Sequence, residues 1–163
     1  MPLRQIAATD GRFRVIHQVN GGTSVARNTA LKAARGRYVA FLDEDDAYEP
    51  RMLEVLHAAA ERTGADVVGC ELARVPEGES LSFPSGPVPS PEEWQVADRK
   101  ALVDWVAEMY PGVPYEVWRN LYRREIVADH WFVPGMRVEQ DLMWHYTLLP
   151  RIAKYVRIDW AGY

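Results

Sequence analysis

An unbroken apolar stretch at residues 38–42 is followed directly by four acidic residues, Asp43, Glu44, Asp45 and Asp46. A run of this length without polar alternation is typical of a strand buried on both faces of a sheet. The acids then fall at the carboxyl end of the strand, where open α/β sheets bind their ligands. Asp43 and Asp45 are separated by one residue, so an extended backbone directs their side chains to the same side.

Similar patterns predict alternating strands and helices around this stretch. The expected strands span residues 13–17, 38–42 and 66–74, and the expected helices span residues 3–8, 23–35 and 50–63. Thr23 or Ser24 suits the cap of the second helix, and Pro50 suits the first turn of the third. This alternation is typical of parallel βαβ units.

A proline-rich excursion at residues 76–93 interrupts the pattern, because it contains five prolines and two glycines. Beyond it, Asp98 is expected to cap a helix that runs to Met109. The segment 115–122 is ambiguous between strand and helix. Two more helices, at residues 123–129 and 139–149, and a strand at residues 154–160 complete the predicted elements.

The composition indicates one soluble domain over residues 1–163, with 48% hydrophobic and 26% charged residues. The net charge of -4, without a cluster of Lys and Arg, argues against nucleic acid as a partner. Cys70 is the single cysteine, so no disulfide framework is expected, and its predicted role is that of a buried thiol.

No apolar run approaches the ~18 residues of a membrane span, and the amino terminus lacks a signal-peptide pattern. We therefore expect a cytoplasmic protein. Peripheral association with the inner face of the membrane stays open as an alternative.

The acidic run suits a divalent cation, because Mg²⁺ takes one or two carboxylates and fills its remaining positions with water and phosphate. The plainer alternative is an acidic surface turn, since short motifs often match by chance.

The tryptophans form a second feature, because all six lie in the second half of the chain: Trp94, Trp105, Trp118, Trp131, Trp144 and Trp160. Core packing is the plain interpretation. The alternative is that one or two of them form an apolar wall for a sugar ring.

Several short motifs follow one another in the first half of the chain. In order, they are Asn20-Gly21-Gly22, Ala26-Arg27-Asn28, Ala34-Arg35-Gly36, Asp43-x-Asp45-Asp46 and Glu49-Pro50. This combination resembles the glycosyltransferases of family 2, bacterial enzymes that build capsule, O-antigen and related polysaccharides. Residues 118–126 and 132–144 are similar to two later segments of the family. The resemblance implies a GT-A-like (Rossmann-related) α/β fold with a mostly parallel sheet flanked by helices.

The implied reaction is inverting transfer of a sugar from a nucleotide sugar, expected to be a UDP-sugar, to a saccharide or lipid-linked acceptor in cell-surface polysaccharide biosynthesis. By the resemblance, Asp141 matches the general base. Mg²⁺ or Mn²⁺ would bridge the donor diphosphate to Asp45 as the direct ligand, with Asp43 beside it.

The resemblance also implies a set of donor-binding residues, which are Gly22, Arg27, Asn28 and Asp43. Two of the assigned residues have plain alternatives. Arg27 could be an ordinary cation on a helix surface. Asp141 could simply favour the amino terminus of a helix through the helix dipole.

The chain also departs from the family pattern. The opening strand, helix and second strand of the family, with their nucleotide-binding turns, have no counterpart before residue 3, and Asn120 and Gln140 replace a usual Lys and Glu. On this interpretation the chain is an amino-terminally truncated member whose sheet lacks the usual first strands, and another copy or segment is expected to cover the open edge.

Two other function classes remain beside glycosyl transfer. One is a non-catalytic remnant that binds a metal or a partner without turnover. The other is a phosphoryl-transfer enzyme, which lacks support because no phosphate-anchoring motif accompanies the acids.

Overall fold

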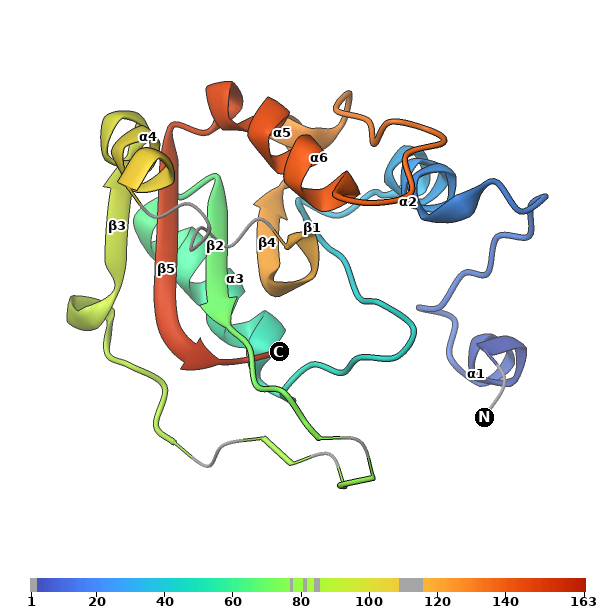
Figure 1. Ribbon diagram of the computed structural model, residues 1–163. Coiled ribbons are helices and arrows are strands. Elements are labelled where there is room, and N and C mark those ends of the chain that lie inside the picture. Colours follow the sequence, from blue (N-terminus) through green and yellow to red (C-terminus); the bar gives the residue numbers. More distant parts are fainter. Residues whose placement is uncertain (1–2, 77, 81, 84–85, 109–115) are drawn as a thin grey trace.

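The fold is seen in a computed structural model that describes residues 3–76, 78–80, 82–83, 86–108 and 116–163. Within these residues, five strands form one sheet in the order β1-β4-β2-β5-β3 (Figure 1). In this order, the strands are β1 Tyr38–Ala40, β4 Asn120–Arg123, β2 Val67–Glu71, β5 Lys154–Ala161 and β3 Gln95–Asp98. A sheet flanked by helices confirms the predicted α/β class.

The strand directions require one correction to the expected sheet. Among the described pairings, β2 and β5 are parallel, whereas β1–β4, β2–β4 and β3–β5 are antiparallel. The sheet of the described residues is therefore mixed and not mostly parallel. Because β1 and β2 are both antiparallel to β4, they still point the same way, with helix α3 (Met52–Thr63) connecting them. The predicted βαβ unit exists, but β4 is inserted between its two strands.

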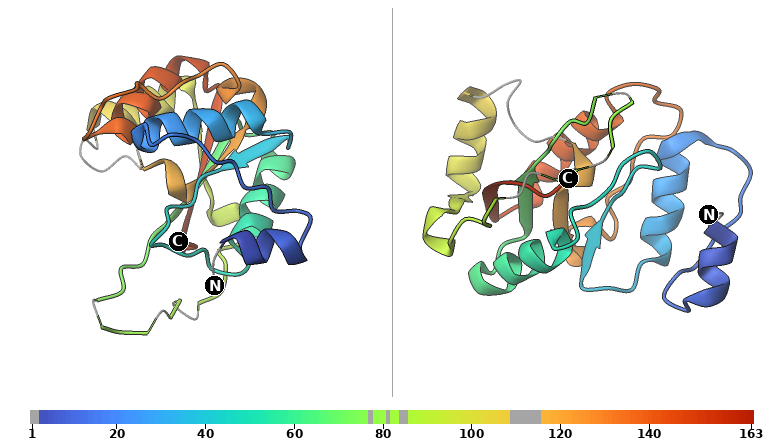
Figure 2. Two further views of the ribbon diagram at one scale, coloured as in Figure 1. Left: turned by 90° about the vertical axis from the view of Figure 1, so that its right-hand side faces the viewer. Right: turned by 90° about the horizontal axis from the view of Figure 1, so that it is seen from below.

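Helices cover both faces of the sheet (Figure 2). Helix α3 lies on one face, and four helices lie on the other, namely α2 Gly22–Ala33, α4 Arg99–Glu108, α5 Arg124–Val127 and α6 Gln140–Leu148. Helix α1 (Leu3–Thr9) precedes them in the chain. Three short 3-10 helices, η1 Pro91–Glu93, η2 Val117–Arg119 and η3 Leu149–Arg151, complete the elements of the described residues.

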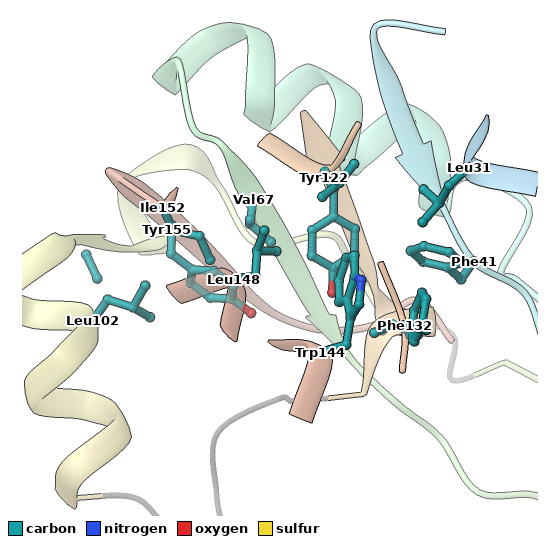
Figure 3. Packing of buried hydrophobic residues seen from close by; sticks show 13 residues of the cluster. Leu31, Phe41, Val67, Leu102, Tyr122, Phe132, Trp144, Leu148, Ile152 and Tyr155 are labelled. Atoms are coloured by element: carbon teal, nitrogen blue, oxygen red, sulfur yellow. The ribbon is translucent and has the colours of Figure 1, made fainter. Parts of the chain in front are cut away.

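Two hydrophobic clusters correspond to the two faces. In β2, Val67 belongs to the cluster beneath α6 and Val68 to the cluster beneath α3, as the alternation of side chains along a strand requires. Trp144 and Tyr122 are among the largest buried side chains of the first cluster (Figure 3). Their rings pack edge to face, with the ring centres 5.2 Å apart. Cys70 is buried in the second cluster, where burial raises its pKa to about 12, so the predicted inert thiol is confirmed.

Helix α3 illustrates why the local sequence forms this element. Met52, Leu56 and Ala59 are spaced at helical intervals and are fully buried against the sheet. Gly64 ends the helix with a φ of 69°, a left-handed conformation that glycine adopts without steric cost, and its N–H donates to the carbonyl of Ala60. The end of the helix agrees with the predicted span of residues 50–63, and its start lies two residues later than predicted.

Three expectations about local structure were wrong, and one strand was missed. Residues 13–17 form no strand, because nothing in the described chain pairs with them, and Phe13 and Ile16 remain about half exposed (50% and 46%). Strand β1 lies at the edge of the described sheet and is only partly buried, so it is not covered on both faces. Gly21, and neither Thr23 nor Ser24, occupies the cap position of α2. Strand β3 was not predicted, since Ala97 is its only buried residue.

The second half follows the prediction more closely. The Asp98 side chain accepts a hydrogen bond from the N–H of Ala101 and so caps α4, as expected. The ambiguous segment near residue 120 resolves into η2 followed by β4. The described part of residues 76–93 contains η1 and no strand. The treatment of that stretch as an excursion from a single domain over residues 1–163 stays a prediction.

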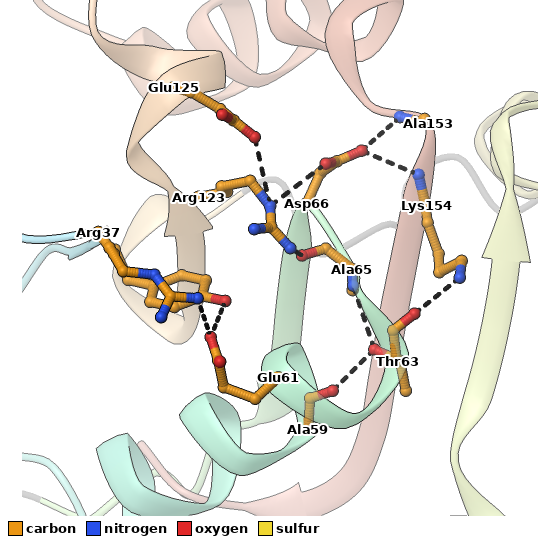
Figure 4. A network of polar contacts seen from close by, with 11 residues as sticks. Arg37, Ala59, Glu61, Thr63, Ala65, Asp66, Arg123, Glu125, Ala153 and Lys154 are labelled. Carbon is orange, nitrogen blue, oxygen red and sulfur yellow. Dashed lines mark hydrogen bonds and ion pairs between the residues drawn. The ribbon is translucent and has the colours of Figure 1, made fainter.

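A polar network stabilises the sheet at the end of the strands that is remote from the acidic run (Figure 4). The Asp66 carboxylate accepts hydrogen bonds from the N–H groups of Ala153 and Lys154 at 2.7 and 3.1 Å. Arg123 donates to the carbonyl of Ala65 at 3.1 Å and lies 3.6 Å from Asp66. These contacts connect the start of β2, the end of β4 and the start of β5. The candidate site lies at the opposite end of the strands.

No helix within the described ranges has the length and apolar character to cross a bilayer.

Candidate active site

The acidic run after β1 borders a cavity of about 840 Å³ that also contacts the loop before α2. Asp43, Glu44 and Asp45 all line this cavity. The backbone turns here, with the N–H of Asp46 donating to the carbonyl of Asp43 at 3.3 Å, so the extended conformation assumed for the alternation of side chains is absent. The Asp43 side chain is 35% exposed, and Asp45 is exposed. We call this space the donor-side cavity.

The loop Asn20-Gly21-Gly22 forms the opposite wall of the donor-side cavity. Gly22 has a φ of 81°, and the Asn20 side chain accepts a hydrogen bond from its N–H at 3.0 Å. A left-handed residue at the start of a helix favours glycine, which explains the motif locally. Gly22 therefore presents backbone without a side chain to the cavity.

Arg27 lies on α2 and connects two acids that are distant in sequence. Its guanidinium donates to Asp43 at 2.8 Å and to Asp141 through the other terminal nitrogen. The side chain is only 11% exposed and lies over the rings of Phe41 and Phe132, at 5.9 and 5.2 Å from their centres. Burial alone would lower the pKa of Arg27, but the two carboxylates raise it, so the guanidinium remains charged. This environment differs from that of an ordinary cation on a helix surface.

Asp141 lies in the first turn of α6, where its carboxylate faces Arg27 and η2. One oxygen accepts from Arg27, and the other accepts from the N–H of Val117 at 3.3 Å. Burial raises the pKa of Asp141 above its usual range, and Arg27 only partly opposes that rise. Glu139, at the cap position of α6, has a φ of 56°, an uncommon left-handed backbone for a residue with a side chain.

Asn28 is occupied by the backbone of Phe132. Its amide nitrogen donates to the Phe132 carbonyl at 2.8 Å, and its oxygen accepts from the Phe132 N–H at 2.8 Å. Asn28 is absent from the described lining of the donor-side cavity, whereas Gly22, Arg27, Asp43 and Asp45 belong to it. The structure therefore brings four of the predicted residues together and directs Asn28 toward the segment before α6.

A second cavity of about 750 Å³ lies on the other side of the acidic run, and the two cavities share Glu44 and Asp45. Trp118 and Tyr163 line this second cavity, which we call the tryptophan cavity. Their rings are stacked with centres 4.2 Å apart, and the Tyr163 hydroxyl donates to Asp46 at 2.8 Å. Burial raises the pKa of Tyr163 above its usual range, so this hydroxyl stays protonated.

The tryptophan cavity separates the alternatives for the tryptophans. Trp144 and Trp160 are buried in the two clusters and serve packing. Trp118 instead lines a cavity, which is the position expected of an apolar wall against which a sugar ring packs. Sequence reasoning gave no signal for Tyr163, because its partner Trp118 is distant in the chain.

The carboxylate oxygens of Asp43 and Asp45 are suitable ligands for a hard divalent cation. Within the part of the chain that the structure describes, no three His, Cys, Asp or Glu side chains group as a complete ligand set. A magnesium ion does not require one, because it binds through one or two carboxylates with phosphate and water in its other positions. The two acids on one cavity wall supply that minimum.

Comparison with known proteins gives a consistent result. The family model described as "Glycosyl transferase family 2" matches residues 2–131. EpsJ of Bacillus subtilis, described as an uncharacterized glycosyltransferase, is 38% identical over 138 residues, which cover 83% of this chain and 39% of EpsJ. A putative teichuronic acid biosynthesis glycosyltransferase of the same organism, TuaG, is 49% identical over 53 residues, which cover 32% of this chain and 21% of TuaG.

Solved structures with a similar fold include S. aureus TarS 1-349, crystallised in complex with UDP-GlcNAc. It superimposes with a TM-score of 0.61 and 18% identity, over 87% of this chain and 38% of TarS. The chain spans about two fifths of the length of EpsJ and of this TarS chain.

Proposed function

This chain belongs to glycosyl transferase family 2 and has a fold of the GT-A type, and from that premise we propose that it transfers a sugar from a nucleotide-diphosphate donor to a saccharide or glycolipid acceptor. The observation that carries the proposal is the position of Arg27 between Asp43 and Asp141. A UDP-sugar is the proposed donor, supported by the UDP-GlcNAc complex of TarS. Cell-surface polysaccharide is the proposed product class, supported by the relative TuaG.

The proposed reaction is a single displacement with inversion. An acceptor hydroxyl loses its proton to the Asp141 carboxylate as its oxygen forms a bond to the anomeric carbon of the donor. The bond from that carbon to the diphosphate breaks, and its electron pair leaves with the diphosphate oxygen. One carboxylate suffices, because no covalent glycosyl intermediate is formed.

The raised pKa of Asp141 suits a base, since a carboxylate with higher proton affinity accepts a proton more readily. Its contact with the N–H of Val117 fixes one carboxylate oxygen, and Arg27 holds the other. Asp141 must therefore exchange at least one of these partners for the acceptor hydroxyl during the reaction.

Asp45 and Asp43 would hold Mg²⁺ or Mn²⁺, which would supply positive charge to the departing diphosphate. Arg27 adds a buried, permanently charged guanidinium at the same cavity wall. In the absence of a donor, that charge is shared by Asp43 and Asp141, which prevents two carboxylates from facing each other unneutralised.

The proposed location is the cytoplasm, at the inner face of the membrane where lipid-linked acceptors would be met. The single free cysteine, Cys70, fits a reducing compartment. The proposal also includes a second copy of the chain, which would cover the open edge of the sheet at β1.

Binding of UDP to the purified chain, with and without Mn²⁺, tests the proposal together with hydrolysis of a panel of UDP-sugars. We expect metal-dependent binding and slow release of UDP from at least one donor. Binding without any donor cleavage or transfer would favour the non-catalytic alternative. No binding in either condition would contradict the proposed function and leave only a remnant that binds a metal or a partner.

A further inference from the structure

We propose that the tryptophan cavity is the acceptor subsite and that it selects saccharides without acidic groups. This inference rests on the proposed function and adds the class of acceptor. It starts from the relation between the two cavities, which meet at Glu44 and Asp45. A donor in one cavity and an acceptor in the other would approach each other across the acidic run.

The tryptophan cavity is also adjacent to the proposed base. Asp141 accepts a hydrogen bond from the N–H of Val117, and the residues on either side of Val117, Glu116 and Trp118, both line the cavity. A hydroxyl bound beside η2 would therefore lie next to the segment that holds Asp141. The donor-side cavity contains Arg27, the other partner of Asp141. Asp141 is in neither described lining, but it bonds Arg27 of the donor-side cavity and the residue between Glu116 and Trp118 of the tryptophan cavity.

The wall of the cavity has the chemistry of a sugar-binding surface. Trp118 is stacked on Tyr163, and Tyr163 is held by its hydroxyl bond to Asp46. A ring that is already fixed loses little conformational freedom when a ligand packs against it. The apolar face of a pyranose can pack on such a ring, while its hydroxyls donate to surrounding carboxylates.

The charge of the lining gives the selectivity. Among the described lining residues, five carboxylates face one guanidinium, that of Arg74. The five are Glu44, Asp45, Asp46, Glu79 and Glu116. Glu116 is paired with Arg119 at 2.8 Å and Asp45 would hold the metal, so the selectivity is assigned to Glu44, Asp46 and Glu79. Hydroxyl and ammonium groups are donors that suit this lining, whereas a carboxylate or phosphate on the acceptor would be repelled. The diphosphate of a neighbouring donor would add to that repulsion.

The test measures the binding of neutral methyl hexosides and the matching methyl hexuronides by NMR titration of the full chain saturated with Mn²⁺ and UDP. We expect at least one neutral hexoside to bind about tenfold more tightly than its hexuronide. Trp118→Leu should weaken that binding about tenfold while Mn²⁺-dependent UDP binding is retained. Trp131→Phe, which changes an exposed tryptophan outside the cavity, should change neither.

A charge variant keeps the test valid if Trp118→Leu fails to fold. Glu79 is exposed, so Glu79→Lys should fold normally and should narrow the preference for neutral over acidic sugars. Glu54→Lys, an exposed change of the same charge on α3, should leave the preference unchanged.

Equal or tighter binding of the hexuronides would overturn the inference, and so would intact UDP binding without binding of any hexoside. Both results would leave the proposed function standing. If the unmodified chain does not bind UDP, that result would instead contradict the proposed function itself, and with it this inference.

Discussion

Arg27 and Asp141 are separated by 114 positions in the sequence and form a partly buried ion pair. The same guanidinium also bonds Asp43, so the proposed base and an acid of the donor-side cavity share one cation. The protonation of Asp141 therefore depends on Arg27. This dependence makes the roles of both residues measurable.

Arg27→Met should move the acid limb of the transfer rate to higher pH. Burial raises the pKa of Asp141, and Arg27 opposes that rise, so removal of Arg27 should raise the pKa further. Since the base must be deprotonated, activity should then be lost at a higher pH as the solution is acidified. A pH–rate profile of kcat/KM measures the shift, and Arg35→Met, an exposed change just beyond α2, is the matched control. An unshifted limb would show that Asp141 does not set the pH dependence.

Asp141→Asn should reduce transfer by a factor of about 10² to 10⁴, the usual contribution of a general base. The amide keeps the size of the carboxylate and an acceptor oxygen for Arg27 but loses the 3.3 Å contact with the N–H of Val117, so the variant should remain folded at a small cost in stability. Binding of UDP and Mn²⁺ should persist. Asp159→Asn, an exposed change on β5, serves as the control. Transfer at the unmodified rate would remove Asp141 from the proposed mechanism.

Asp45→Asn should weaken Mn²⁺-dependent UDP binding by about tenfold or more, because the amide is a poorer ligand for a hard cation. Asp45 is exposed, so the variant should unfold at the same temperature as the unmodified chain. Isothermal titration with and without EDTA measures both contributions. If EDTA and Asp45→Asn each leave UDP binding unchanged, the metal assignment fails.

Asn28→Ala should destabilise the fold by about 1–3 kcal/mol, because the N–H and carbonyl of Phe132 both lose their partner. Phe132 itself is buried, so water replaces these bonds poorly. Urea unfolding measures the difference. The neighbouring change Thr29→Ala removes an exposed hydrogen bond to Gln18 and should cost less than about 1 kcal/mol. Equal effects of the two changes would argue against a bracing role for Asn28.

Gly69→Ala should destabilise the fold by about 3 kcal/mol, through overpacking in the middle of β2. A methyl group at this position would lie 2.2 Å from the Tyr155 hydroxyl and 2.4 Å from the Asn120 side-chain oxygen. Those two groups bond each other at 3.1 Å, so neither can move without breaking that bond. Gly11→Ala meets no atom within 4 Å and should change stability by less than about 1 kcal/mol. Thermal unfolding of the pair measures the contrast.

Patterns within one element predicted the fold well where burial follows the local period. Helix α3 is an example, since Met52, Leu56 and Ala59 fall on one face and Gly64 ends it. The pairing of strands was not predictable in this way, because it depends on which distant segment supplies the neighbour. Residues 13–17 have the apolar content of a strand but no described partner, whereas β3 has a partner and only one buried residue, Ala97.

The candidate site shows the same division. The residue types of Asp43, Asp45, Arg27 and Asp141 carry the chemistry, and the motifs around them marked each one. Their mutual contacts are non-local, so the sharing of Arg27 between two carboxylates could not be read from spacing. For the same reason, the sequence could not show that the Asn28 side chain is hydrogen-bonded to the backbone of Phe132, 104 residues away.

The insertion of β4 between β1 and β2 has a consequence for the order in which the chain can fold. Tyr122 is opposite Val39 on one side and Val67 on the other, so β1 and β2 are joined only through a segment that is synthesised later. A nascent chain that ends before β4 holds two strand segments that point the same way and lack their shared neighbour. Such non-local pairing delays folding, because a long loop must close before any contact compensates for it. The other neighbour of β2, strand β5, is synthesised later still. The sheet is therefore completed from its interior, late in synthesis, and the ribosome-bound amino-terminal half should remain open to proteases until residue 161 has emerged.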